Sequence, residues 1–247
     1  MKKETLYVAF STQKGGVGKT TFTVLVASYL YYLKGYNVAV VDCDYPQHSI
    51  SAMRKRDAEQ VNGDDYYKQL AFNQFKALGK KAYPVLCSSP DEAIKTADEF
   101  LVSAGMEYDV VFFDLPGTVN SEGVMDYIFT PIAADRVVLE SSLSFAVAIH
   151  KLLVKNEACR LKGLHLFWNM VDGREKTDLY TLYEQTIGEL ELPLMKVFIP
   201  DTKRFKKELD AQRKTVFRST LFPADKRLVK GSNMEELITE IAYLIKL

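Results

Sequence analysis

Short apolar runs alternate with longer helical patterns along nearly the whole chain. The short runs are almost continuously hydrophobic and rich in β-branched residues, which predicts strands that are covered on both faces. We expect strands in LYVAF (6–10), NVAVVD (37–42), PVLCS (84–88), DVVFFD (109–114), RVVLES (136–141), LHLFWNMV (164–171) and LMKVFI (194–199). Helical patterns lie between them, over residues 20–34, 90–105, 142–159 and 176–190.

This alternation predicts an α/β fold, a mostly parallel, twisted sheet with helices on both faces. Sites in such sheets gather at the carboxyl ends of the strands. The chain has 247 residues and no internal repeat, low-complexity tract or linker, so we expect one domain spanning residues 1–247. The segment Met53–Tyr83 is more polar and is interpreted as a peripheral helical excursion.

Composition adds limits on location. Cys43, Cys87 and Cys159 are odd in number and far apart, which argues against a disulfide framework and fits a reducing compartment. The N-terminal residues lack the apolar region of a signal peptide. The most apolar stretch, Val24–Leu33, is shorter than the ~20 residues that a membrane-spanning helix needs. We therefore predict a cytoplasmic protein.

The loop after the first predicted strand, STQKGGVGKTT, indicates a phosphate site. Gly15, Gly16 and Gly18 allow backbone N–H groups to turn toward phosphate oxygens at the start of a helix. Lys19 would then reach the β- and γ-phosphates, and the hydroxyl of Thr20 would bind Mg²⁺. A glycine-rich turn without a ligand is the alternative, which the strand–loop–helix context disfavours.

This loop departs from the usual pattern G-x-x-x-x-G-K-[ST] in two ways. Gln13 stands where the first glycine is expected, and an additional lysine, Lys14, follows it. The pattern alone does not say what a second lysine would do there.

Carboxylates end two further predicted strands. Asp42 and Asp44 follow the second strand, where they could hold metal-bound water and orient an attacking water molecule, although Asp44 also fits an ordinary turn. Asp114 ends the fourth strand, in the place of the second carboxylate of phosphate-loop enzymes. Gly117 follows at a spacing that lets its N–H meet the γ-phosphate.

Taken together, KGGVGKTT, VDCDYPQHS and YDVVFFDLPG resemble the partition and septum-site ATPases of the ParA/MinD type, whose phosphate loop is deviant in the same way. AADRVVL, LFWNMVD and VFIPDTKRFKKELD lie where that family has its middle and adenine-binding segments. The resemblance implies a deviant phosphate-loop ATPase that uses ATP and Mg²⁺.

The resemblance also implies roles for individual residues. Lys14 would cross a dimer interface to the partner's nucleotide, so that ATP holds a homodimer together; an exposed loop lysine is the alternative. A lysine supplied in trans can oppose the negative charge that develops during phosphoryl transfer. Asp44 would position the attacking water. Thr20 would bind the metal ion, and Asp42 and Asp114 would bind water molecules coordinated to it.

At the other end of the nucleotide, Asn169 would read the adenine edge, since an amide offers both a donor and an acceptor. Asn169 equally fits a strand-end cap. Pro200 and Asp201 would wrap the base. The predicted nucleotide-binding residues are Gly15, Gly16, Val17, Gly18, Lys19, Thr20, Thr21, Gly117, Asn169, Pro200 and Asp201.

Two features depart from the family pattern. The family often has a proline or another apolar residue near the end of the fifth strand, where the predicted strand VVLESS has Glu140. The segment 51–83 matches nothing in the family. The chain lacks C-x-x-C, a tyrosine-rich tail and a duplication, which argues against related iron–sulfur carriers, tyrosine kinases and arsenite-pump ATPases.

The C-terminal quarter carries a basic run in a chain of zero net charge. Residues 203–230 hold ten basic and three acidic residues, a net charge of +7. Clustered Lys and Arg are the footprint of sequence-independent phosphate binding, although a solvated basic face would look the same. We predict non-specific DNA contacts from Lys203, Arg204, Lys206, Lys207, Arg213, Lys214 and Arg218.

The last predicted helix, MEELITEIAYLIKL, has one apolar face and a polar face dominated by Glu235, Glu236 and Glu240. A helix that lies on a membrane surface should instead be basic there, so we expect this helix to pack on the protein.

The function predicted from the sequence is an ATP-dependent dimerising ATPase that binds DNA non-specifically and segregates a plasmid or another mobile element. A partner protein would stimulate its slow hydrolysis. The alternatives are an interaction switch that regulates a conjugation or secretion apparatus and a membrane-associated positioning ATPase.

Overall fold

The computed structural model describes residues 4–116, 125–151, 159–173, 178–209 and 215–247. The strands are β1 (Leu6–Phe10), β2 (Val38–Asp42), β3 (Val85–Cys87), β4 (Val110–Asp114), β5 (Tyr127–Ile132) and β6 (Gly163–Trp168). The helices are α1 (Lys19–Tyr32), α2 (Ser49–Gly63), α3 (Asp65–Leu78), α4 (Ala93–Ser103), α5 (Arg136–Ile149), α6 (Asp178–Glu189), α7 (Lys226–Val229) and α8 (Met234–Leu244), with 3-10 turns η1 (Pro90–Glu92) and η4 (Lys203–Lys206).

Among the described residues, the strands form one sheet in the order β3-β2-β4-β1-β5-β6, and every pairing is parallel. Strands β1, β2, β4 and β5 are buried along their whole length, as continuous apolar runs predict. The predicted α/β fold is confirmed. Because the strands are parallel, the residues that follow β1, β2 and β4 meet at one edge.

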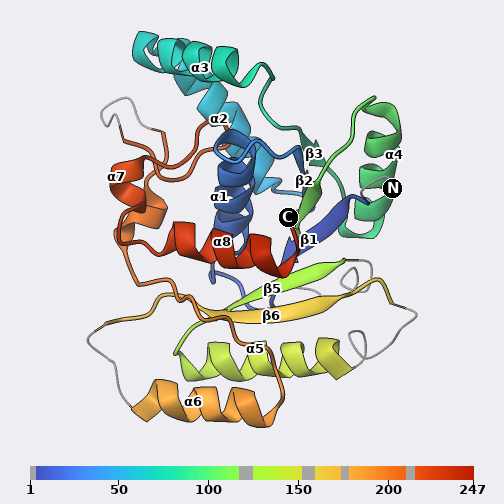
Figure 1. Cartoon of the computed structure of the whole chain (residues 1–247), viewed down its shortest axis with the longest axis vertical. Helices are drawn as coiled ribbons and strands as arrows, with labels where there is room; N and C mark the ends of the chain where they lie inside the picture. The colour runs from blue at the N-terminus through green and yellow to red at the C-terminus, as the bar shows by residue number, and fades with distance from the viewer. Residues whose placement is uncertain (1–3, 117–124, 152–158, 174–177, 210–214) are drawn as a thin grey trace.

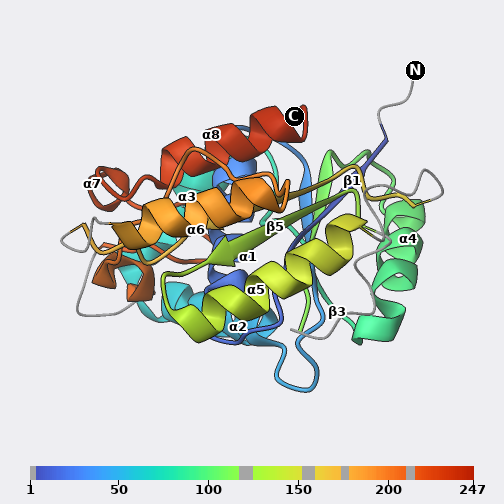
Figure 2. The same ribbon diagram turned by 90° about the horizontal axis from the view of Figure 1, so that it is seen from below.

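Helices cover both faces of the sheet (Figures 1 and 2). Alternate strand residues divide between two cores: Val8 and Phe112 pack with α1 and α8, whereas Ala9 and Phe113 pack with α4, α5 and α6. Helix α1 packs in the same core as the sheet and α8, and eleven of its fourteen residues are buried. From Phe22 onward α1 is therefore packed in the core, and only its first turn is partly exposed.

The strand predicted over 136–141 is wrong, because this segment is the first part of α5. The carboxylate of Asp135 caps the helix by accepting from Val138 N at 2.9 Å, and Arg136 pairs with Glu140 four residues later. The strand at this place in the sheet is β5, which the apolar-run pattern missed. Its last residues are Pro131 and Ile132, so Glu140 is no departure from the family pattern.

The strand predicted over 194–199 is also wrong. The segment forms no continuous ladder with β6: Leu194 makes an isolated bridge, and the N–H groups of Met195 and Ile199 donate to carbonyls of β6 at 2.7 and 2.8 Å. The backbone N–H groups of Lys196 and Val197 donate instead to the carboxylate of Glu240 on α8, at 2.9 and 3.0 Å. At these two residues a carboxylate accepts the N–H groups that a neighbouring strand would otherwise bind.

The predicted helical excursion is confirmed as α2 and α3, which project beyond the sheet (Figure 1). A small third core joins them to the C-terminal segment, through Tyr67, Ala71, Leu221 and Phe222 among others. The final helix packs on the protein as predicted, since α8 buries Met234, Leu237, Ile238 and Ile241.

Candidate nucleotide site

The loop between β1 and α1 has the backbone of an anion-binding turn. Gly16 and Gly18 adopt left-handed conformations, with φ of 79° and 93°, which side chains rarely tolerate. Gly18 is the N-cap of α1, and a Cβ atom there would lie 3.1 Å from the ring of Phe22. The free N–H groups at the start of α1 therefore follow directly on the glycine turn, where an anion is favoured.

Lys19, the first residue of α1, folds back over this loop. Its ammonium group donates to the carbonyl of Thr12 at 3.3 Å and to the carbonyl of Lys14 at 3.1 Å. Burial lowers the pKa of Lys19, while nearby Asp114 and Asp44 oppose that shift. The charge is thus fixed at the centre of the loop.

Asp42 and Asp114 lie side by side at the carboxyl ends of β2 and β4, where their Cα atoms are paired in register. Both side chains are buried. The carboxylate of Asp42 accepts from Ser51 N at 2.8 Å and from Asp44 N at 3.4 Å. Burial raises the pKa of Asp42, as expected for a carboxylate removed from water.

Asp114 is the most perturbed of these groups. Burial raises its pKa to about 7, a hydrogen bond with the Thr20 side chain opposes this, and the charges of Asp42 and Asp44 add to it. Its Oδ2 atom is buried and has no hydrogen-bond partner among the described residues. A buried carboxylate oxygen beside a threonine hydroxyl suits Mg²⁺, which takes few protein ligands and completes its shell with water and phosphates.

The residues present therefore fit a magnesium site of the kind predicted. Within the described part of the chain, no group of three or more His, Cys, Asp or Glu residues could hold a metal ion, so Mg²⁺ here would depend on water and phosphates for most of its ligands.

Asp44 lies just beyond this pair, at the turn into α2. Its carboxylate accepts from the hydroxyl of Ser49 at 2.9 Å, and its carbonyl accepts from His48 N at 2.7 Å. The ring of His48 contacts the carbonyl of Asp42 at 3.1 Å. Asp44 is thus fixed in the same cluster, half-buried, next to Lys19 and Asp114.

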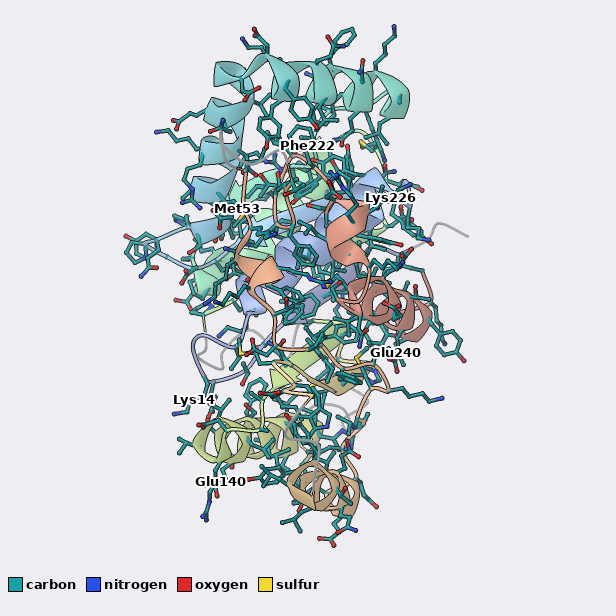
Figure 3. All side chains as sticks on the ribbon, turned by 90° about the vertical axis from the view of Figure 1, so that its left-hand side faces the viewer. Lys14, Met53, Glu140, Phe222, Lys226 and Glu240 are labelled. Atoms are coloured by element: carbon teal, nitrogen blue, oxygen red, sulfur yellow. The ribbon has the colours of Figure 1, made fainter. Side chains whose placement is uncertain are left out.

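Lys14 differs from Lys19 in direction. Figure 3 shows it at the edge of the molecule, with its side chain pointing away. Its carbonyl group, which accepts from Lys19, faces inward. The side chains of Lys14 and Lys19 therefore point in different directions from the loop.

A cavity of about 380 Å³ lies beside the loop and the first turn of α1. Its lining residues are Gly16, Gly18, Thr21, Phe22, Asn169, Met170, Pro200, Asp201, Thr202, Phe205, Lys206 and Arg218. The predicted base-contacting residues are thus brought together with the phosphate loop. Two aromatic rings, Phe22 and Phe205, lie 6.2 Å apart in its wall.

Asn169 follows β6 and connects the two ends of the site. Its side-chain amide donates to the carbonyl of Val17 at 2.9 Å, and its backbone N–H donates to Ile132 at 2.7 Å. Pro200 and Asp201 are held nearby, since Asp201 N donates to Val171 at 2.9 Å. The amide therefore holds the loop as well as lining the cavity.

The predicted DNA-contacting cations differ in exposure and contacts. Lys203 and Lys206 are exposed on η4, and Arg204 donates to the carbonyls of Leu228 and Lys230, which joins η4 to α7. Lys207 is half-buried and follows η4. Lys206 also lines the cavity, together with Arg218. Arg213, Lys214 and Gly117 lie outside the described residues.

Sequence reasoning missed part of the cavity wall. Phe22 and Phe205 were indistinguishable from core residues, because both also pack on other rings. Met170 has a left-handed backbone with φ of 56° and lines the cavity beside Asn169. Only its position directly after Asn169 could have indicated it.

Comparison with known proteins gives a consistent result. Residues 8–216 match the model of the CobQ/CobB/MinD/ParA nucleotide binding domain. The chain is 27% identical to the chromosome-partitioning ATPase Soj of Thermus thermophilus over 183 residues, which cover 68% of this chain and 70% of Soj.

Solved structures share the fold at low identity. The structure of pNOB8 ParA bound to nonspecific DNA aligns with a TM-score of 0.60 at 16% identity, over 98% of this chain and 99% of that one. Cobyrinic acid a,c-diamide synthase from Mycobacterium smegmatis, with bound ATP analogue and magnesium, aligns with a TM-score of 0.55 at 18% identity, over 98% and 94%. In the described ranges, no helix has both the length and the apolar character needed to cross a membrane.

Proposed function

This chain belongs to the CobQ/CobB/MinD/ParA family of nucleotide-binding domains, and we propose that it is an ATPase that dimerises on ATP and binds DNA without sequence preference in that state. One observation carries the proposal. The left-handed glycine loop, Lys19 and the buried pair Asp42 and Asp114 converge at one sheet edge, with an aromatic-walled cavity alongside.

Each group has a role that its position supports. The N–H groups around Gly16 and Gly18 bind phosphate oxygens, and Lys19 adds a positive charge close to them. Thr20, Asp42 and Asp114 would hold Mg²⁺. The bound ion would neutralise charge on the phosphates. Asp44, fixed by Ser49, orients the attacking water.

The base would occupy the cavity beside Asn169. Phe22 and Phe205 supply apolar and aromatic surface, and Asn169, Pro200 and Asp201 supply polar groups at the rim. Because the amide of Asn169 also holds the carbonyl of Val17, contacts with the base and the shape of the phosphate loop would be linked.

Lys14 supports the dimer part of the proposal. Its side chain points away from its own loop (Figure 3), so it can approach a nucleotide in a second subunit that faces the first. ATP would then lie between two subunits and contact both, and hydrolysis would separate them.

The DNA part is supported by the basic residues that the fold brings together. Arg204 joins η4 to α7, so that Lys203 and Lys206 lie on an element attached to the one that carries Lys226 and Arg227. Soj is named as a chromosome-partitioning ATPase, and the pNOB8 ParA structure contains nonspecific DNA. The proposed task is the segregation of a plasmid or another mobile element in the cytoplasm, with a partner protein that stimulates hydrolysis.

A second candidate is an ATP-driven interaction switch for a conjugation or secretion apparatus. The projecting pair α2 and α3 favours it, because Tyr66, Leu70 and Phe72 expose apolar surface there. This candidate uses the same nucleotide site and requires no DNA affinity. A membrane-associated positioning role fits less well, since the polar side of α8 is acidic.

The test is fluorescence anisotropy of a random-sequence duplex titrated with the protein, in ATP plus Mg²⁺ and again in ADP. We expect binding only with ATP, weakening steeply with salt because phosphate contacts release counterions. Changing Lys203 and Lys226 together to Glu should abolish binding and leave ATP affinity unchanged.

A control is Lys95→Glu, which reverses the charge of one lysine on α4, at the opposite side of the molecule from α7 (Figures 1 and 2). This variant should bind DNA like the wild type. If the wild type binds ATP but no DNA in either nucleotide, the DNA part is refuted and the interaction switch becomes the better account.

A further inference from the structure

Arg218 was predicted as a DNA contact, but its guanidinium group points into the molecule. Nη1 donates to the hydroxyl of Thr21 on α1 at 2.5 Å, and Nη2 donates to the carboxylate of Glu208. The side chain is 21% exposed, and Arg218 lines the nucleotide cavity. A cation in this position is poorly placed for a DNA backbone outside.

The backbone that carries Arg218 is fixed from two sides. Its own N–H donates to the carbonyl of Lys207 at 2.9 Å. The next two residues are tied to the buried carboxylate of Asp57 on α2, which accepts from the hydroxyl of Ser219 and from both the N–H and the hydroxyl of Thr220, at 2.7 to 3.0 Å. The side chain therefore extends from a rigid segment.

The location of Thr21 indicates what the guanidinium would meet. Gly18 caps α1, so Thr21 is the third helical residue, and its N–H is among those left free at a helix start. A phosphate bound on these N–H groups lies next to Thr21. Arg218 approaches from the cavity side, whereas Lys19 and Asp114 lie on the loop side, so the phosphate nearest the base is the one within reach.

The guanidinium has donors to offer. Its Nε atom is buried and has no partner in the described part of the chain. Glu208 holds Nη2 and also pairs with Arg56, which is 59% exposed, at 3.3 Å. Glu208 thus lies between an inner and an outer arginine, and only the inner one lines the cavity.

We propose that Arg218 binds the α-phosphate of the nucleotide, with Glu208 and the Asp57-anchored segment orienting its guanidinium. This inference rests on the proposed nucleotide-binding function and adds a ligand from the C-terminal part of the chain. Arginine suits the role, because its planar fork matches phosphate oxygens and its charge persists when it is partly buried.

The experiment measures displacement of a fluorescent ATP analogue by ATP, AMP and adenosine. Arg218→Ala should weaken ATP and AMP by about 10- to 100-fold, the range for a charge-assisted hydrogen bond, and leave adenosine unchanged. Arg56→Ala, which removes the other arginine from Glu208, should change none of the three. Arg218→Lys should weaken ATP and AMP by less, and it carries the test if Arg218→Ala does not give the wild-type circular dichroism spectrum.

Equal AMP affinity in the wild type and the Arg218 variants would overturn the inference. So would an equal loss for adenosine and AMP, because that pattern indicates a change in cavity shape instead of a lost phosphate contact. A wild-type protein that binds none of these ligands would refute the proposed function itself, a result distinct from either.

Discussion

At the scale of single residues, the site is built from charged groups that the fold removes from water. Lys19 and Asp114 both have pKa values shifted toward their neutral forms, mainly by burial. Such shifts mean that the ionised forms are destabilised in the protein alone. A ligand that carries Mg²⁺ and phosphate supplies the opposite charge to each, so the arrangement favours the bound state.

The first prediction concerns Asp114. Its pKa is about 7 in the folded protein and 3.8 without the fold, so its contribution to stability is present below about pH 4 and is lost as pH rises through about 7. The difference in unfolding free energy between Asp114→Asn and the wild type should therefore grow in favour of the variant by about 2–3 kcal/mol as pH rises from 5 to 8.

Urea unfolding of both proteins at the two pH values, in EDTA and without nucleotide, measures this difference. A stability gap that does not change between pH 5 and pH 8 would show that Asp114 is ionised throughout this range.

At the scale of elements, sequence patterns identified those strands whose apolar runs are unbroken, such as β1 and β4. They missed β5, because Thr130 and Pro131 interrupt its run. The run that followed, 136–141, looked like a strand although Asp135 caps a helix there. The apolar run alone favours a strand, whereas the cap favours a helix. The segment is helical because Asp135 caps it and because the helix buries Leu139 and Leu143.

The candidate site could likewise be predicted only in part from the sequence. The proximity of the glycine loop to Asp42 and Asp114 was predictable, because parallel strands bring their carboxyl ends together whatever the loops do. The direction of Arg218 was not predictable. It depends on the bonds of Arg218 with Lys207 and Glu208 and on those of the next two residues with Asp57. These last bonds join residues 162 and 163 positions apart and leave no periodic signal.

The second prediction concerns the element that holds this segment. Asp57 accepts three hydrogen bonds from Ser219 and Thr220 and is 3% exposed. Asp57→Ala leaves those donors without a partner and should lower the free energy of unfolding by about 2–4 kcal/mol.

Glu59→Ala is the matched control, since Glu59 is exposed on the same helix, and it should change stability by less than about 0.5 kcal/mol. Chemical denaturation of both variants makes the comparison. Equal stability of the two would mean that α2 and the 219–222 segment do not depend on this carboxylate.

At the scale of the whole molecule, one subunit contains every group proposed for phosphate and metal binding, whereas Lys14 points out of it (Figure 3). A complete site would then need a second subunit. In a two-fold dimer each subunit gives its Lys14 to the other, so both sites are completed together. This arrangement would make assembly a condition for hydrolysis.

The third prediction separates a lysine that acts in trans from one that acts in its own site. Lys14→Ala and Asp44→Ala should each bind ATP and hydrolyse almost none. Mixed in equal amounts, they should recover about a quarter of wild-type turnover, because about half of the dimers are mixed and each mixed dimer has one site with an intact Asp44 and an intact Lys14 from its partner.

If Lys14 acts within its own subunit, no site in the mixture has both residues and turnover stays at the level of the single variants. A mixture of Lys14→Ala with Lys14→Ala, Asp44→Ala double variant is the control, since neither subunit then offers the lysine. Recovery in the first mixture alone would place the added lysine of the loop across the interface and tie hydrolysis to the paired state.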